Sequence, residues 1–119
     1  MAASRTIPFG VHTVIETVAA PMIMAAPLLF EFSQGAAVVT FAIGALLLSL
    51  ALQGAGPRRA IPLSAHAGWD YMVAAIAVVA GLVIGMVTGA WAQGVFLVGI
   101  GAAQVALTAS TRFSVPAGA

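Results

Sequence analysis

Four long apolar blocks constrain this chain more than any other feature of its sequence. A helix needs about 20 apolar residues to cross a hydrocarbon core of about 30 Å. The blocks have that length and lie at residues 11–32, 36–54, 66–87 and 91–110. Strands of a membrane β-barrel are about half as long and alternate between apolar and polar residues, which these blocks do not. We therefore predict four transmembrane helices.

The composition also indicates a membrane protein. Hydrophobic residues make up 62% of the 119-residue chain and charged residues only 6%, whereas a soluble domain carries about 25% charged residues. The absence of cysteine excludes disulfides, thiolate catalysis and cysteine-based metal sites. A net charge of +1 is too small for a nucleic-acid-binding surface. We expect the lipid bilayer to be the main partner, and no nucleic acid.

The arginines predict the orientation in the membrane. Arg5 precedes the first predicted span, Arg58 and Arg59 lie between the second and third, and Arg112 follows the fourth. The two loops on the opposite side contain neither lysine nor arginine. Because loops rich in Lys and Arg stay inside, we expect a multi-pass protein of the inner (plasma) membrane with both termini cytoplasmic.

A cleaved signal peptide is the alternative for the first block, since Arg5 gives it a basic start. Glu16, Pro21 and Pro27 interrupt this block, which is already long enough to span. We therefore expect an uncleaved helix that is kinked at its prolines.

The two halves of the chain resemble each other. An offset of 55 residues aligns residues 18–30 with 73–85 and residues 41–52 with 96–107, so that Gly44 corresponds to Gly99. Each half is a helical hairpin that starts on the same side, and such halves are parallel repeats related by an axis along the membrane normal.

The predicted fold class is an all-α membrane protein whose four transmembrane helices form two parallel-repeat helical hairpins. Residues 1–119 form a single transmembrane domain, with repeat 1 at about 11–54, a cytoplasmic linker at about 55–65 and repeat 2 at about 66–110.

A short motif in the first half resembles a known family. The segment AAPLLF (25–30) has Ala26-Pro27-Leu28 where SPW-repeat proteins, small bacterial integral membrane proteins, have Ser-Pro-Trp. In the second half, GLV (81–83) occupies the corresponding place and has neither the proline nor the tryptophan. The resemblance implies a pair of two-helix membrane repeats. It implies no activity and no functional residues, because the family is uncharacterised.

Each half opens with a histidine four residues before a carboxylate, His12 with Glu16 and His66 with Asp70. Residues i and i+4 share a helix face, and parallel spans place both pairs at one depth. If the first and third spans touch, two imidazoles and two carboxylates converge. Such a set suits a divalent transition metal or a proton-binding cluster, and ionisable residues within spans commonly mark function.

The alternative is that these residues are polar groups at the membrane surface. They lie near span ends, where side chains can reach the headgroups. Glu16 or Asp70 could then pair with Arg5, Arg58 or Arg59, and the repeat alone would explain why the pairs correspond. The two interpretations differ in whether the four side chains face one another or face headgroups.

Other polar and small residues predict packing rather than chemistry. Gly81, Gly85 and Gly89 form overlapping GxxxG patterns, which we assign to packing within the chain. Gln93 and Gln104 are expected to form hydrogen bonds between helices.

Two classes of function stay open. Because no nucleophile–base pair, phosphate loop or nucleotide motif is present, we expect no enzyme and no cofactor. One function is a non-catalytic structural or accessory membrane component, as a homo-oligomer or within a larger membrane complex. The alternative is a proton- or metal-linked transporter or channel subunit that uses His12, Glu16, His66 and Asp70, with a divalent transition metal as its cofactor or cargo.

Overall fold

The computed structural model describes residues 5–56, 59 and 61–114. All four predicted helices are present and are long and apolar enough to cross a membrane. Their ends differ from the predicted ones by three residues at most. In chain order the elements are β1 (Ile7–Pro8), α1 (Phe9–Leu29), α2 (Gln34–Ala55), α3 (Leu63–Thr88), α4 (Trp91–Ala109) and β2 (Thr111–Arg112).

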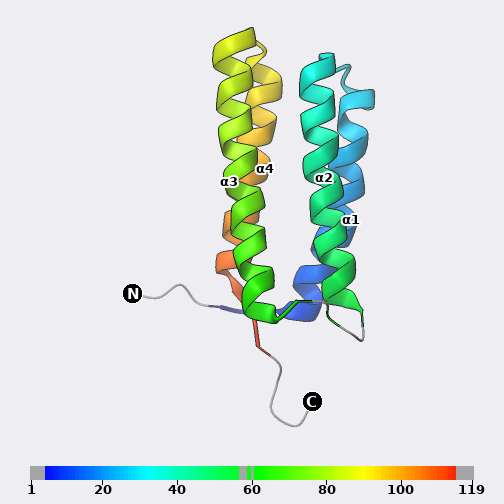
Figure 1. Ribbon diagram of the computed structural model, residues 1–119, viewed down its shortest axis with the longest axis vertical. Coiled ribbons are helices and arrows are strands. Elements are labelled where there is room, and N and C mark those ends of the chain that lie inside the picture. The colour runs from blue at the N-terminus through cyan, green and yellow to red at the C-terminus, as the bar shows by residue number, and fades with distance from the viewer. Residues whose placement is uncertain (1–4, 57–58, 60, 115–119) are drawn as a thin grey trace.

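The helices form two antiparallel hairpins, α1 with α2 and α3 with α4, that stand side by side (Figure 1). Helices α1 and α3 run in the same direction, so the predicted fold of two parallel-repeat hairpins is confirmed. The α2–α3 link, β1 and β2 all lie at one end of the bundle, which we call the terminal end.

A short parallel pairing of β1 with β2 was not predicted. Ile7 lies opposite Thr111 and Pro8 opposite Arg112, and the Ile7 amide donates to the Ser110 carbonyl at 3.0 Å. Two residues are too few to carry a strand pattern, and the partners lie at opposite ends of the sequence. The pairing fixes the start of α1 against the end of α4.

Glycines let α3 and α4 pack with their backbones in contact. A methyl group at Gly81 would collide with the carbonyl oxygen of Gly94, and one at Gly94 would collide with that of Gly81. Gly85 lies against the indole ring of Trp91. The assignment to packing within the chain is confirmed for Gly81 and Gly85, since close backbone approach needs small residues, but not for Gly89, which has no such neighbour. Gly89 ends α3 in a left-handed conformation, with φ of 76°.

The packing corrects the repeat alignment. Gly44 packs against the Ala20 carbonyl, and Gly101 packs in the same way against the Ala74 carbonyl. The offset is therefore 54 residues from α1 to α3 (74 − 20) and 57 from α2 to α4 (101 − 44). The offset of 55 was therefore wrong for the second helix of each hairpin, whereas 54 is also the spacing of His66 from His12 and of Asp70 from Glu16. A Cβ atom added at Gly99 would have no neighbour within 4 Å.

The lengths of the helices explain this difference in offset. Helix α3 has 26 residues and α1 has 21, while the link that follows α3 is shorter than the link that follows α1. The change in register between the repeats therefore comes from the region where each hairpin turns.

The hairpins meet along an apolar seam and are tied at the end opposite the terminal end. There, the backbone N–H and the hydroxyl of Ser33 both donate to Oε1 of Gln93, each at 3.1 Å, as expected for an interhelical glutamine. The buried apolar core comprises Ala20, Ile23, Ile43, Leu47, Leu50, Val73, Ala77 and Leu97.

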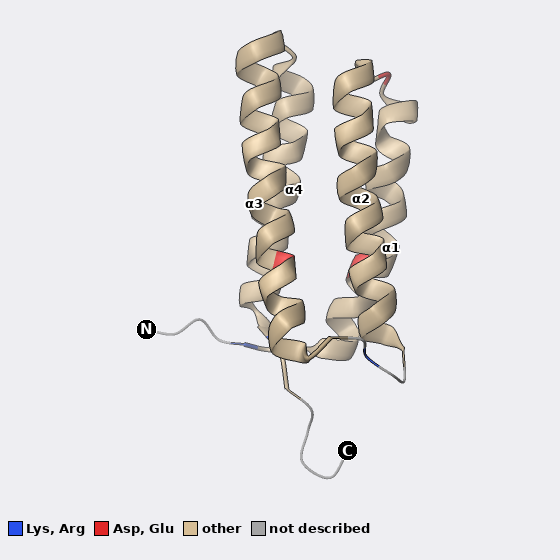
Figure 2. Ribbon diagram, viewed as in Figure 1, with Lys and Arg blue, Asp and Glu red and all other residues tan. Residues whose placement is uncertain are grey.

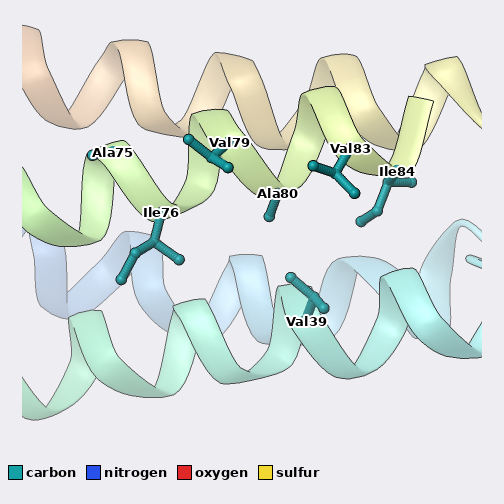
Figure 3. A pocket seen from close by; sticks show the side chains of 7 residues that line it. All are labelled: Val39, Ala75, Ile76, Val79, Ala80, Val83 and Ile84. Carbon is teal, nitrogen blue, oxygen red and sulfur yellow. The ribbon is translucent and has the colours of Figure 1, made fainter. Parts of the chain in front are cut away.

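The outer surface of the helices is apolar. Figure 3 shows one hollow of this surface, where α3 faces α2. Its volume is about 460 Å³ and all its walls are aliphatic: Val39, Ala75, Ile76, Val79, Ala80, Val83 and Ile84. Such a surface fits contact with lipid chains.

Candidate metal centre

The two histidine–carboxylate pairs lie inside the bundle and face one another. His12 and Glu16 come from α1, and His66 and Asp70 from α3. Their exposed fractions are 0, 2, 1 and 0%, respectively. Figure 2 shows acidic positions at similar heights in both hairpins, nearer to the terminal end. The interpretation as polar residues that reach the headgroups is therefore wrong, because parallel α1 and α3 turn both pairs toward the seam between the hairpins.

Each imidazole contacts a carboxylate from both helices. His12 Nε2 lies 2.9 Å from Glu16 Oε1 and 2.9 Å from Asp70 Oδ2. His66 Nε2 lies 3.5 Å and 3.3 Å from the same two oxygens. These four ligand atoms all lie within 4.8 Å of one another. We call the four residues the His–carboxylate cluster.

Helix α4 and the residues after it supply two side chains that contact the outer atoms of the cluster. Thr111 Oγ1 lies 2.8 Å from His12 Nδ1 and donates to the Leu107 carbonyl at 2.6 Å. The Gln104 amide donates to Glu16 Oε2 at 2.7 Å, as expected for an interhelical glutamine. Sequence reasoning missed Thr111, which lies just beyond the predicted fourth span. No sequence pattern identifies it, because Thr111 lies beyond the end of α4 and belongs to β2.

Two phenylalanines lie at the terminal end of the cluster. The Phe9 ring stands edge-on to His66 with centroids 5.0 Å apart, and the Phe113 ring stands edge-on to His12 at 5.3 Å. The two phenyl rings are themselves 5.6 Å apart. The Arg59 guanidinium lies over the Phe9 ring, 5.3 Å from its centroid.

Histidines, rather than arginines, contact the two acids. Within the described residues, the ionic contacts of Glu16 and Asp70 are with His12 and His66. Arg59 contacts an aromatic ring instead, and Arg58 lies outside the described residues. The two buried carboxylates therefore require positive charge inside the cluster, either from protons on the imidazoles or from a bound cation, since an uncompensated buried charge is strongly destabilising.

The arrangement fits a metal ion. Ligand atoms of a tetrahedral site with bonds of about 2.0–2.1 Å stand about 3.3–3.4 Å apart. The four nitrogen–oxygen separations run from 2.9 to 3.5 Å and all the ligand atoms lie within 4.8 Å of one another, so the side chains would have to close in further around a tetrahedral ion. Among the described residues, Glu16 Oε1 and His66 Nε2 are buried without a hydrogen-bond partner. Both atoms carry lone pairs that an ion would use.

Comparisons with protein-family models, with curated proteins and with solved structures find no match to this chain. The resemblance to SPW-repeat proteins therefore stays a prediction that rests on Ala26-Pro27-Leu28.

Proposed function

We propose that this integral membrane protein binds one divalent transition-metal ion between its two hairpins. The observation that carries the proposal is the convergence of four buried ligand atoms within 4.8 Å, from His12, Glu16, His66 and Asp70. Two of these residues belong to α1 and two to α3. One ion in this place would bond the first hairpin to the second.

Charge and ligand type favour a divalent transition metal. Two ionised carboxylates and two neutral imidazoles carry a charge of −2, which one divalent cation balances. Mg²⁺ and Ca²⁺ prefer sites made wholly of oxygen atoms. Imidazole nitrogens mixed with carboxylate oxygens suit zinc, iron and manganese instead.

The number of protein ligands favours a structural role for the ion. Four protein ligands close a tetrahedral site, whereas catalytic zinc sites keep one position open for water or substrate. Binding to a closed site adds its free energy to the folded state. The function supported best is a non-catalytic structural or accessory membrane component whose two hairpins are joined by the ion.

Zinc titration of metal-depleted protein in detergent tests the proposal. We expect one zinc ion per chain, together with a rise in the midpoint of thermal unfolding. Glu16→Gln should abolish both effects, because it removes a charged ligand while keeping its shape. Glu31→Gln is the matched control, since Glu31 is an exposed acid in the α1–α2 link. Failure of the wild-type chain to bind zinc or manganese would contradict the proposal, as would equal binding by both variants.

A metal- or proton-linked transporter subunit is the second candidate, and a cavity favours it. This cavity of about 140 Å³ lies between α1, α2 and α4 and reaches Glu16 and Gln104. Movement of one hairpin away from the other at this place would expose the cluster. Proteoliposomes that contain a zinc-sensitive dye test this function: zinc entry that Glu16→Gln abolishes supports transport, and entry no faster than in empty liposomes excludes it for zinc.

A further inference from the structure

The two ligands from α1 have hydrogen-bond partners on their outer atoms. His12 Nδ1 contacts Thr111 Oγ1 at 2.8 Å, and Glu16 Oε2 accepts from Gln104 at 2.7 Å. Both partners come from the second hairpin or the residues that follow it, and both are buried, with exposed fractions of 0% for Thr111 and 6% for Gln104. Water therefore does not replace them readily.

The hydrogen bonds of Thr111 determine the tautomer of His12. A threonine hydroxyl has one hydrogen, and that of Thr111 goes to the Leu107 carbonyl at 2.6 Å. Its oxygen must therefore accept from His12, which places a proton on Nδ1. His12 Nε2 also forms a hydrogen bond with Asp70 Oδ2 at 2.9 Å, and loss of the Nε2 proton to an incoming cation would leave the lone pair of a neutral imidazole on this atom. This is the atom that faces Glu16 and Asp70.

Gln104 acts in the same way on the carboxylate. Its amide occupies Glu16 Oε2 and leaves Oε1 free of hydrogen bonds. Oε1 is the oxygen that lies 2.9 Å from His12 Nε2 and 3.5 Å from His66 Nε2.

Within the part of the chain that the structure describes, no hydrogen bond reaches the outer atoms of the ligands from α3, and the repeat explains why. With the offset of 57 between α2 and α4, the counterpart of Gln104 is Leu47 (104 − 57) and that of Thr111 is Gly54 (111 − 57). Neither residue has a polar side chain. Asp70 Oδ1 is accordingly buried without a hydrogen-bond partner among the described residues. Gly54 contacts His66 only by packing: a Cβ atom added at Gly54 would lie 3.1 Å from His66 Cε1.

We propose that Thr111 and Gln104 are positioning residues that orient His12 and Glu16 for metal binding, whereas the ion itself orients His66 and Asp70. This inference rests on the proposed function, because it says which residues hold the metal ligands in place before the ion binds. Partners of this kind commonly change metal affinity by about 10–100-fold when removed.

Zinc affinity of Thr111 variants in the full-length protein tests the proposal. We expect Thr111→Val to weaken zinc binding by about 10–100-fold and Thr111→Ser, which keeps the hydroxyl, to restore it. Thr108→Val is the matched control: Thr108 is a buried threonine near the end of α4, and its hydroxyl has no hydrogen-bond partner among the described residues. Equal affinities for Thr111→Val and Thr108→Val would overturn the inference.

Gln104→Leu gives a second variant that keeps the test decisive if Thr111→Val fails to fold. It installs in α4 the residue that α2 carries at the corresponding place, Leu47. We expect weaker zinc binding, again by about 10–100-fold. Wild-type affinity in Gln104→Leu would overturn its positioning role.

Nitrogen-15 spectra of the imidazoles separate this inference from the proposed function. We expect a proton on Nδ1 of His12 in the wild-type protein and in Thr111→Ser, and loss of that preference in Thr111→Val. If the wild-type chain binds no metal, the proposed function fails, and these spectra alone decide whether Thr111 orients His12. A proton on Nδ1 that is unaffected by Thr111→Val overturns the inference.

Discussion

At the scale of single residues, each member of the His–carboxylate cluster depends on the others. The four side chains are at most 2% exposed, so none of them exchanges its contacts for water. Truncating one member leaves the remaining carboxylates buried without full compensation. Removing one partner of a buried ion pair typically costs about 3–5 kcal/mol of stability.

Double-mutant cycles on the two histidines test this dependence. With saturating zinc, His12→Ala and His66→Ala should each lower the free energy of unfolding by about 3–5 kcal/mol. The double variant should lose clearly less than the sum, because the first change already removes the ion that both residues bind. Chemical unfolding in detergent measures this. Small, additive losses would show that the two histidines act independently.

Part of the cluster could be predicted from sequence, because its members are close in sequence. The i, i+4 spacing identifies His12 with Glu16 and His66 with Asp70, and the parallel repeat predicts equal depth. Thr111 and Phe113 could not be found in this way. They reach the cluster through the pairing of β1 with β2, which no local pattern encodes.

At the scale of helices, apolar length predicted the spans, but fine register depended on packing. Helix α1 ends at Leu29 rather than at residue 32. Just after this end, Glu31 adopts a positive φ of 52°, which does not continue a right-handed helix. The repeat offset is three residues larger from α2 to α4 than from α1 to α3. This difference is visible only from the contacts of Gly44 and Gly101. Identical residues in Ala- and Leu-rich spans align at several offsets, so sequence alone could not choose among them.

The orientation of the helices in the membrane is a prediction of its own. The positive-inside rule places the α2–α3 link in the cytoplasm and the α1–α2 link outside. Because the chain has no cysteine, single cysteines can be introduced at Gln34 and Gly56. In intact cells, an impermeant thiol reagent should label Gln34→Cys and leave Gly56→Cys unlabelled until the membrane is opened. Labelling of Gly56→Cys alone in intact cells would reverse the orientation.

At the scale of the whole molecule, the proposed ion would join two units that otherwise meet along an apolar seam. The described contacts between the hairpins comprise this seam, the Ser33–Gln93 hydrogen bonds, the pairing of β1 with β2 and the polar contacts around the cluster. Lipid chains are as apolar as the seam itself, so hydrophobic burial alone holds helices together weakly in a bilayer. A bonded ion between α1 and α3 would therefore contribute strongly to the association of the hairpins.

X-ray absorption at the zinc edge, on zinc-loaded protein dialysed against zinc-free buffer, tests the central claim most directly. The predicted result is one retained zinc ion per chain with four nitrogen or oxygen ligands at about 2.0–2.2 Å. Two of these ligands should show the outer-shell scattering of imidazole, and one imidazole signal should disappear in His66→Ala. Loss of the zinc on dialysis, or a zinc shell without imidazole, would contradict the claim that His12, Glu16, His66 and Asp70 bind an ion.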